Sequence, residues 1–332
     1  MPNRMIDEPL LSLVGYGRRG PGQRDRLTPA QIQQIARTVG RAPEVMVKVL
    51  PKGASTVKGV RGHLDYIGRE GEVELEADDG DKSQGKDAGA DLLEDWDLDL
   101  DQYRRQTHLA ASRGRAPPKL VHKLVFSMPA GTPPEKVLGA VRNFCREEFA
   151  LKQRYVMALH TDEPHPHVHV VIKAMGEQGQ RLQIRKATLR EWRRGFAKHL
   201  NILGVEANAT ERAVRGVTGL RKLDSIYRPM RDSKRHSTHL ERRARAVAVE
   251  LQSGRLSVEP GKTKLLETRR MVERGWSAIQ DELIREGHTA LAGQVKSFVS
   301  RMPALRTDKE WIAAKLLEVA RKPKVVEQDL AR

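Results

Sequence analysis

The clearest pattern of polar and apolar positions lies in the segment HTDEPHPHVHVVIKA, residues 160–174. After Pro166 the side chains alternate, with two histidines and a valine on one side and Val, Val and Ile on the other. A period of two predicts a β-strand with one apolar face and one imidazole face. The preceding residues YVMALH, 155–160, predict a second strand, so residues 161–166 become the loop of a hairpin. Pro166 then stands at the strand entrance, where its missing N–H costs little.

The same periodicities and the helix-capping residues predict the other elements. Thr28 followed by Pro29 is typical of a helix start, and Gly40 ends the apolar stripe that follows. We expect strands at 44–50, 119–129 and 180–186, and helices at 28–39, 55–68, 133–150, 187–203, 235–252, 261–286, 288–301 and 307–321. Their order predicts an α+β fold, an antiparallel sheet flanked by helices, followed by an all-helical C-terminal region.

Local composition divides the chain into three parts. Residues 1–44 carry a basic Gly-rich segment, which we expect to be mobile, and one short helix; residues 45–228 form the main domain, and residues 229–332 the helical region. Within the main domain, residues 70–105 are acidic, with fourteen Asp and Glu against two lysines between positions 70 and 101. So little apolar content predicts a flexible acidic loop that can be deleted without unfolding the protein.

The charge of the whole chain narrows the classes of partner. Its 332 residues carry a formal net charge of +17, and a basic surface of that size favours nucleic acid. A soluble basic protein without such a partner is the alternative. The single cysteine, Cys145, excludes a disulfide framework and fits a reducing compartment. No apolar run approaches the roughly 18 residues of a membrane span, so we expect no membrane insertion.

The hairpin histidines predict a metal site. His160 ends the first strand, and His167 and His169 share one face of the second, so the three imidazoles can converge. Three nitrogen ligands leave coordination positions open for a substrate. His165, in the loop, is expected to support the site or face DNA rather than bind the ion.

Two other metal motifs fit poorly. A cupin-like dioxygenase needs a glutamate a few residues after the H-x-H pair, where this chain has Val-Val-Ile-Lys, and no helical HExxH motif is present. Imidazoles favour Mn²⁺, Zn²⁺ or Ni²⁺, whereas phosphate oxygens favour Mg²⁺. We expect a divalent cation, Mg²⁺ or Mn²⁺, with Zn²⁺ and Ni²⁺ as alternatives.

The helix expected at 55–68 presents a tyrosine beside two glycines. Tyr66 lies roughly opposite the apolar stripe and on the side of Gly59 and Gly62. A glycine inside a helix costs about 1 kcal/mol relative to alanine, so a cleared face suggests that a backbone approaches it. A tyrosine there suits a nucleophile that attacks a DNA phosphate, and an ordinary half-exposed tyrosine is the alternative. The stripe that we expect in the core is Val57, Val60, Leu64 and Ile67.

Together these stretches resemble the tyrosine relaxases, or mobilisation nucleases, of conjugative elements, in particular the VirD-type MOBP subgroup of the HUH endonuclease superfamily. The resemblance covers about residues 45–216 and rests on HLDYIGREGEVEL, HKLVFSMPAGT, HTDEPHPHVHVV and ATERAVRG. Relaxases place the tyrosine before the histidine triplet, here His167-Val168-His169, whereas replication initiators and transposases place it after. Tyr66 precedes the triplet, which favours a relaxase.

The resemblance implies an activity and a site. Tyr66 would nick one DNA strand at an origin of transfer and form a 5′-phosphotyrosyl intermediate, on a relaxase fold with an RRM- or ferredoxin-like core. Asp162 corresponds to the family's acidic residue and is the expected base. The implied cation ligands are His160, His167 and His169, and the secondary candidates are Glu163, His165 and His122, the last matching a family histidine of unassigned role.

The implied partners are single-stranded DNA at the origin of transfer, relaxosome accessory proteins and a type IV coupling protein. The protein would act as a monomer on DNA in the bacterial cytoplasm and enter the recipient cell bound to the strand. The basic residues expected to contact DNA are Arg181, Arg185, Lys186, Arg190, Arg193, Arg194, Lys198, Arg212 and Arg215, with a merely solvated helix face as the alternative.

Two other functions remain open. A replication initiator or transposase of the same superfamily would use Tyr227, in SIYRP, as its nucleophile. A non-catalytic DNA-binding module would hold the metal for structure alone. The helical tail is expected to dock a partner through one apolar stripe, so residues 1–230 should nick DNA without it.

Overall fold

The computed structural model describes residues 12–20, 25–50, 55–96, 98, 100–217 and 238–321, and Tyr227 lies outside this part of the chain. The chain forms two compact units, one of residues 40–209 and one drawn from both ends, residues 1–39 and 210–332. The first, which we call the sheet unit, contains the histidine hairpin. The second, which we call the helical unit, is described by itself below.

The sheet unit is built on a six-stranded sheet with the order β1-β4-β6-β5-β2-β3, in which all neighbouring strands are antiparallel. The predicted hairpin pairs His160 with His167 and Ala158 with His169. This arrangement confirms the α+β fold expected from the sequence. The strands are β1 (Met46–Leu50), β2 (Leu75–Ala77), β3 (Lys82–Ser83), β4 (Val121–Ser127), β5 (Tyr155–His160) and β6 (His167–Lys173).

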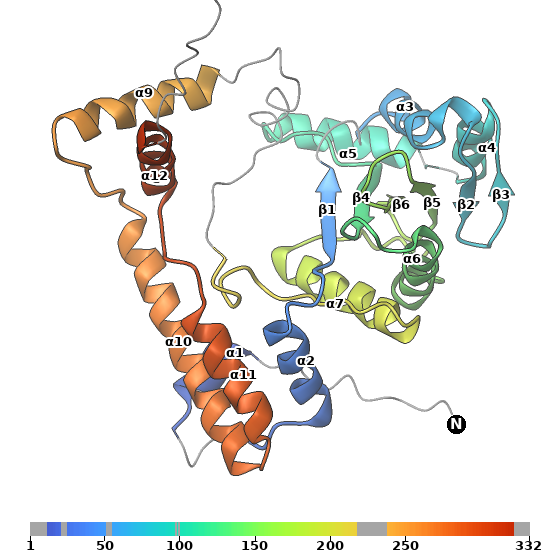
Figure 1. Ribbon diagram of the computed structural model, residues 1–332. Helices are drawn as coiled ribbons and strands as arrows, with labels where there is room; N and C mark the ends of the chain where they lie inside the picture. The colour runs from blue at the N-terminus through green and yellow to red at the C-terminus, as the bar shows by residue number, and fades with distance from the viewer. Residues whose placement is uncertain are drawn as a thin grey trace, which may run out of the picture. The chain divides into compact units, whose positions relative to one another are not determined.

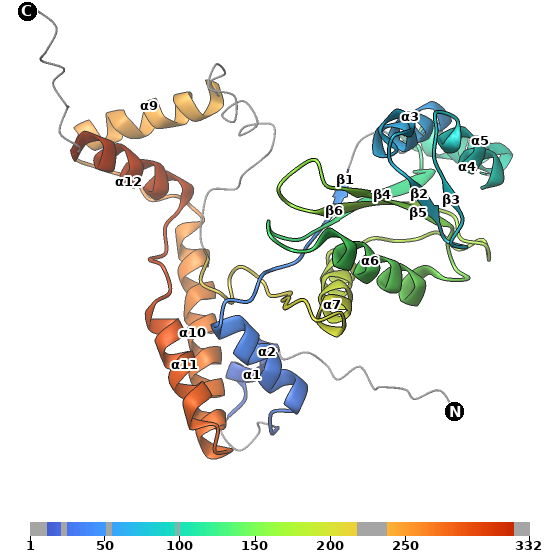
Figure 2. The same ribbon diagram turned by 45° about the vertical axis from the view of Figure 1, so that its right-hand side comes forward.

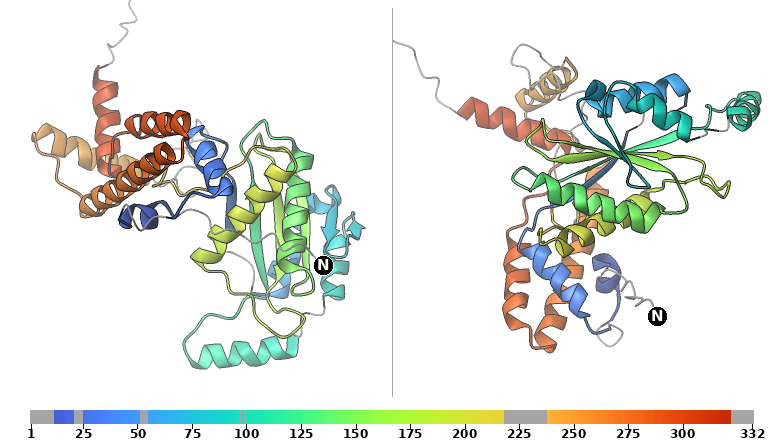
Figure 3. Two further views of the ribbon diagram at one scale, coloured as in Figure 1. Left: turned by 90° about the horizontal axis from the view of Figure 1, so that it is seen from below. Right: turned by 90° about the vertical axis from the view of Figure 1, so that its right-hand side faces the viewer.

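Helices cover both faces of this sheet (Figures 1 and 2). On one face lie α6 (Pro134–Phe149) and α7 (Lys186–Ile202), packed on an aromatic core that includes Phe126, Phe144 and Trp192. On the other lie α3 (Val57–Ile67), α4 (Ala88–Asp95) and α5 (Leu100–Ser112). The edge-on view in Figure 3 shows the sheet as the middle layer of three. The site described below lies on the α3 face.

The acidic segment 70–105 is not the flexible loop that its charge predicted. It contains β2, β3, α4 and the start of α5, and its few large apolar residues are buried against α3. Leu75 is 2% exposed and Trp96 is 1% exposed. The composition is polar on average, but the apolar residues are spaced so that they reach one surface together. This segment therefore completes the core on the α3 face.

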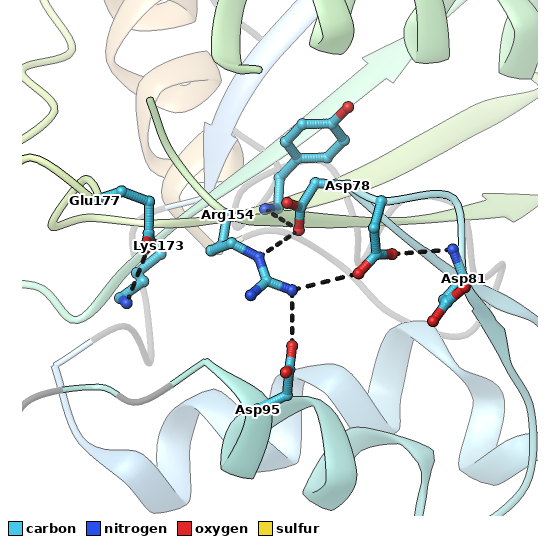
Figure 4. Close-up of polar contacts among 8 residues, drawn as sticks. Asp78, Asp81, Asp95, Arg154, Lys173 and Glu177 are labelled. Atoms are coloured by element: carbon cyan, nitrogen blue, oxygen red, sulfur yellow. Dashed lines mark hydrogen bonds and ion pairs between the residues drawn. The ribbon is translucent and has the colours of Figure 1, made fainter. Parts of the chain in front are cut away.

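Its acidic side chains pair with basic residues of the rest of the sheet unit. Arg154, directly before β5, donates from Nε to Asp78 at 2.9 Å and from Nη2 to Asp95 at 2.7 Å (Figure 4). Arg142 of α6 donates to both carboxylate oxygens of Glu76, at 2.5 and 2.6 Å. The negative charge thus serves to attach the segment, because its partners are only 23–30% exposed and the pairs are partly shielded from water.

The strand expected at 180–186 does not form. Arg181 makes only an isolated bridge with Met175. Leu182 and Ile184 point into the aromatic core as part of an irregular segment. Their alternation with polar residues mimics a strand, although what they fill is the rim of the α6–α7 core.

The helical unit joins the two ends of the chain, which the sequence had assigned to separate parts. Tyr16 and Leu13, in a segment expected to be mobile, are buried against α10. A Cβ on Gly17 would lie 2.6 Å from the Cα of Gly275, so the two helices need glycines where they cross. The C-terminal helices agree with the predicted ones. The helices are α1 (Leu13–Arg18), α2 (Pro29–Val39), α9 (Thr238–Gln252), α10 (Lys262–Arg285), α11 (Thr289–Ser300) and α12 (Asp308–Arg321) (Figure 1).

This packing changes the interpretation of the tail. The apolar stripe of α10 is occupied by the chain's own N-terminal residues rather than left open for a partner. A protein that ends at residue 230 would lack α10 and expose Leu13, Tyr16 and Ile35, so it is a poor test of the nuclease alone. Among the described helices, none is long and apolar enough to cross a bilayer.

Candidate active site

Three histidines meet on the α3 face of the sheet, as the hairpin predicted. One nitrogen of each of His160, His167 and His169 lies within 4.8 Å of the others. Their ring centroids are 4.6–5.2 Å apart. The β5–β6 register accounts for this, because His160 and His167 are directly paired and His169 lies two residues further along the same face.

The chemistry of these nitrogens suits a bound cation. The Nε2 of His160 lies 2.7 Å from the carbonyl oxygen of Ile67, and the Nδ1 of His167 lies 3.0 Å from that of His165, so each ring turns its other nitrogen away from these carbonyls. That nitrogen of His160, Nδ1, lies 3.3 Å from the Nη2 of Arg69. The buried Nδ1 of His169 has no hydrogen-bond partner among the described residues. Burial lowers the pKa of His160 and lowers the pKa of His169 to about 3, which keeps these two rings neutral, as metal ligands must be.

Tyr66 lies beside this cluster, on the last turn of α3. Its ring centroid is 6.0 Å from that of His169 and 6.5 Å from that of His160. The side chain is 51% exposed, and its hydroxyl makes no hydrogen bond within the part of the chain that the structure describes. The phenol is therefore accessible from solvent.

The sequence of α3 explains why Tyr66 is held there. The side chain of Thr56 caps the helix by accepting from the N–H of Gly59 at 3.1 Å. Val60, Leu64 and Ile67 are fully buried, as the stripe predicted, whereas Val57 in the first turn remains 40% exposed. A Cβ on Gly62 would meet nothing within 4 Å, which agrees with the expected cleared face.

His63 is a site residue that the sequence did not single out. Its ring stacks on Tyr66 with centroids 5.9 Å apart and planes 15° apart, and meets His169 edge-on at 6.0 Å. Burial, and then the nearby charge of Lys123, lowers the pKa of His63 to about 4. The signal was present in the sequence, since His63 precedes Tyr66 by three residues and so lies on the same side of the helix.

Arg69 is the second residue that the sequence did not single out. Its Nη2 donates to Asp162 at 2.5 Å and lies 3.3 Å from the Nδ1 of His160. Its guanidinium carbon lies 5.2 Å from the centroid of the Tyr66 ring. Asp162, the expected base, is thus ion-paired with Arg69, and no direct contact links it to the Tyr66 hydroxyl within the described residues.

The backbone that carries Arg69 is in an unusual conformation. Arg69 and Glu70 have φ values of 49° and 55°, and Gly71 has a φ of 99°. Left-handed conformations cost non-glycine residues roughly 1–2 kcal/mol each, and such strain persists where surrounding structure imposes it. Here the N–H of Gly85 donates to the carbonyl of Gly71, and a Cβ on Gly71 would lie 2.5 Å from the backbone of Gly85. The acidic segment therefore holds the turn that presents Arg69.

The secondary candidates do not join the histidine cluster. Glu163 and His165 are exposed in the hairpin loop, and the carbonyl of His165 accepts from His167. His122 pairs with Ile172 and lies on the α6–α7 face, where its Nε2 is 3.1 Å from the carbonyl of Leu182. The side chain of His122 points to the face of the sheet opposite the cluster, because successive residues of a strand face opposite sides.

Several residues expected to bind DNA have partners within the protein. Arg181 donates to the carbonyl of Lys119 at 2.8 Å, Arg193 to that of Val47 at 3.2 Å, and Lys198 to Glu147 at 3.1 Å. Among the remaining basic residues of this group, those of α7 lie on the face of the sheet opposite the histidines, and those in residues 210–217 belong to the helical unit. Exposed in or beside α7 are Arg185, Lys186, Arg190 and Arg194, while Arg212 and Arg215 lie in residues 210–217.

One exposed lysine does share the face of the histidines. The register pairs Lys48 with Val125, and Val125 with His169, so Lys48 extends the same row toward the β1 edge. Met46 is 48% exposed, and its row runs through Ser127 to His167. The sequence identified β1 as a strand but could not give its neighbour, so these residues could not be placed beside the site.

Comparison with known proteins finds similarity to relaxases. The family described as relaxase, MobA/VirD2-like, nuclease domain, matches residues 73–201, which include the three histidines and leave out Tyr66. The T-DNA border endonuclease VirD2 of Rhizobium radiobacter is 26% identical over 187 residues, 52% of this chain and 43% of that protein. The protein of the same name from Agrobacterium fabrum (strain C58 / ATCC 33970) is 26% identical over 188 residues, 53% of this chain and 41% of its own length.

The VirD2 protein of Rhizobium rhizogenes is 27% identical over 137 residues, 39% of this chain and 30% of its own length. The chain therefore spans less than half the length of these curated relatives. The matched region coincides with the strands and helices that assemble the histidine cluster. Residues 73–201 thus match the nuclease domain of the MobA/VirD2-like relaxases, and over this region the chain resembles a VirD-type relaxase.

Proposed function

We propose that this protein is a relaxase that nicks one strand of DNA at an origin of transfer, with Tyr66 as the nucleophile. The observation that carries the proposal is the placement of an exposed tyrosine ring within 6.0–6.5 Å of two of three converging histidines. Tyr66 is far from the three histidines in the sequence, so it is the fold that brings the tyrosine and the histidines together. The match of residues 73–201 to the MobA/VirD2-like relaxase nuclease domain supports the same reaction class.

In the proposed reaction, the phenol oxygen of Tyr66 forms a bond to phosphorus and the bond to the 3′ oxygen breaks. The products are a 5′-phosphotyrosyl link and a free 3′-OH, so the energy of the phosphodiester is kept for rejoining. His160, His167 and His169 would hold a divalent cation, Mg²⁺ or Mn²⁺ with Zn²⁺ or Ni²⁺ as alternatives, which would neutralise charge on the phosphate oxygens. His63 supports the ring of Tyr66 by stacking, which restricts the phenol before DNA arrives.

Asp162 remains the proposed proton acceptor for the phenol, whose ordinary pKa is about 10. The carboxylate is 54% exposed and held by Arg69, so it must reach the phenol through a water molecule or after a shift of the loop. Glu163 is a less favoured alternative, because it lies in the same loop without a contact to the cluster.

The DNA strand is proposed to cross the open part of the α3 face beside the histidines, where Lys48 can contact its phosphates. The exposed arginines and lysines of α7 would then contact DNA only beyond the nick region. Relaxosome accessory proteins, a type IV coupling protein, monomeric action on DNA, a cytoplasmic location and passage into a recipient cell belong to this proposal as consequences of the reaction class.

Covalent capture tests the proposal. The full-length protein is incubated with a randomised single-stranded DNA library and Mn²⁺, and the adduct is digested with trypsin. We expect the nucleotide on the peptide that runs from Gly62 to Arg69, and no adduct from Tyr66→Phe, because neither a cation nor a base can replace the missing oxygen. A nucleotide on Tyr227 would instead indicate a replication initiator or transposase. DNA binding without any adduct would indicate a non-catalytic module.

A further inference from the structure

Arg69 touches the proposed nucleophile, the proposed base and one of the three histidines. Its Nη2 contacts the carboxylate of Asp162 and the Nδ1 of His160, and its planar group lies over the ring of Tyr66. Because these three residues come from α3, β5 and the hairpin loop, Arg69 is the one side chain in the described residues that contacts all of them. A residue in this position can do more than neutralise one carboxylate.

Most of the hydrogen-bonding capacity of Arg69 is unused. A guanidinium has five N–H donors in a fixed plane, and the side-chain hydrogen bonds of Arg69 within the described residues all involve Nη2. The side chain is 31% exposed, so the Nε and Nη1 donors lie where a ligand from solvent can approach. A phosphate oxygen accepts a charge-assisted N–H bond from a guanidinium, and such a bond is among the stronger hydrogen bonds in proteins.

We propose that Arg69 binds a non-bridging oxygen of the DNA phosphate that Tyr66 attacks, using Nη1 while Nη2 holds Asp162. This inference rests on the proposed function and adds a residue that contacts the reacting group. The phosphorus must lie next to the Tyr66 hydroxyl, and the guanidinium already lies over the ring that carries this hydroxyl. Arg69 thereby fixes the phosphate from the side of α3, while the histidines lie on the side of the sheet.

The backbone around Arg69 supports a fixed position. The two consecutive left-handed residues, Arg69 and Glu70, are followed by Gly71, which has no room for a side chain against Gly85. The N–H of Gly71 and that of Val73 both donate to the carbonyl of Gly68, at 2.9 Å each. A side chain that starts from so constrained a turn needs little reorganisation when a phosphate binds, which is the condition for selective stabilisation of the transition state.

The first test compares cleavage by Arg69→Lys, Arg69→Gln and the matched control Arg61→Gln. Arg61 is exposed on the same helix and has no contact to the cluster, so its variant removes the same charge at a nearby place. With an oligonucleotide recovered as a wild-type adduct, single-turnover cleavage at saturating DNA should fall by about 10²–10³-fold for both Arg69 variants. Arg61→Gln should keep the wild-type rate. Lysine should not rescue, because a single ammonium keeps the charge but cannot reach Asp162 and the phosphate from two fixed nitrogens.

The second test asks whether Arg69 contacts that particular phosphate. Affinity is measured for Tyr66→Phe and for the Tyr66→Phe, Arg69→Gln double variant, with the scissile phosphate intact and with a neutral methylphosphonate in its place. We expect the Arg69 substitution to weaken binding of the intact strand and to leave binding of the methylphosphonate strand unchanged. This internal comparison remains valid if the variant is somewhat less stable.

The outcomes separate the two proposals. Wild-type cleavage rates for Arg69→Lys, or equal loss of affinity for both oligonucleotides, would overturn the role of Arg69 and leave the relaxase proposal standing. Failure of the wild-type protein itself to form an adduct would overturn the proposed function, and this inference with it.

Discussion

His122 and His169 are alike in most properties that identify a functional histidine, yet they lie on opposite faces of one sheet. Both are on central strands, and burial lowers the pKa of His122 to about 4 and that of His169 to about 3. Each has an Nδ1 without a hydrogen-bond partner among the described residues. Burial and a low pKa therefore do not distinguish the site.

The neighbours of the two histidines do distinguish them. His169 lies within 6.0 Å, between ring centroids, of His63, Tyr66, His160 and His167. His122 faces a backbone carbonyl, that of Leu182, at the rim of an aromatic core. The same residue type in the same sheet is thus a member of a polar cluster in one case and a structural donor in the other.

The largest expected difference is in metal binding and cleavage. His169→Ala should abolish nicking and weaken Mn²⁺ binding by more than about 100-fold, since even residues that only support a ligand cost 10–100-fold. His122→Gln, which can still donate to the carbonyl of Leu182, should leave both unchanged. Calorimetric titration with Mn²⁺ and a cleavage assay measure the two effects. Equal losses for the two variants would remove the distinction between the faces.

A second control addresses the hairpin loop. His165→Ala should leave Mn²⁺ affinity nearly intact, because it is the backbone carbonyl of His165 that accepts from His167. A loss as large as that of His169→Ala would mean that the loop supplies a ligand.

The next largest effect concerns the core on the α3 face of the sheet. If the acidic segment completes the α3 face, Trp96→Ala should lower the free energy of unfolding by about 3–5 kcal/mol. Leu109→Ala, at a position 56% exposed on α5, should change it little. Deletion of residues 78–95 should destabilise the sheet unit, contrary to the expectation from charge alone. Urea denaturation measures all three, and a deletion variant of unchanged stability would contradict the described core.

A smaller effect follows from the pH dependence of stability. His122 has a pKa of about 4 in the folded protein and about 6.5 in the unfolded chain, so between these values the unfolded state binds more protons. Its contribution is full above pH 6.5 and is lost as the pH falls toward 4. On going from pH 7 to pH 5, the wild type should lose up to about 2 kcal/mol more than His122→Gln. Identical losses in urea denaturation would show that His122 has the same pKa in the folded and unfolded states.

The smallest effect tests the glycine-cleared side of α3. Gly62→Ala should raise the free energy of unfolding by about 0.5–1 kcal/mol, because a Cβ there meets nothing within 4 Å and alanine favours the helix. Nicking should nevertheless decrease if DNA approaches this side. Gly89→Ala in α4, where a Cβ would lie 2.9 Å from Asp65 and 3.0 Å from Leu64, should instead destabilise the protein. Unchanged nicking by Gly62→Ala would show that the cleared side is not a DNA contact.

The sequence predicted what depends on local periodicity. The hairpin, its imidazole face and the buried stripe of α3 followed from alternation and from the helical period, and they bring His160, His167 and His169 together as expected. What it could not predict depends on pairing between distant segments. Arg69 meets Asp162 across 93 positions, and Arg154 meets Asp78 across 76.

The average charge of a segment was a poor guide to where that segment lies in the fold. The acidic segment was expected to be a flexible loop because it is acidic and has little apolar content, but the arginines that pair with it lie elsewhere in the chain. The basic helix α7 was expected to line the DNA site because it is basic, but no pattern within the helix tells which face of the sheet it covers. The partners of the acidic segment and the face covered by α7 both depend on how the strands are arranged in the sheet. The sequence of a single segment does not determine that arrangement.

The hydrogen bond between His160 and the carbonyl of Ile67 has a consequence for the order of assembly on DNA. Ile67 follows Tyr66 directly, so a ligand of the proposed cation is tied at 2.7 Å to the peptide next to the proposed nucleophile. A DNA strand that fixes the position of Tyr66 and a cation that fixes the position of His160 would each favour the conformation in which the hydrogen bond between His160 and Ile67 forms. By thermodynamic reciprocity, the factor by which DNA tightens cation binding must equal the factor by which the cation tightens DNA binding. Either ligand could then limit the protein's activity in a cell, because a low concentration of one would weaken the binding of the other.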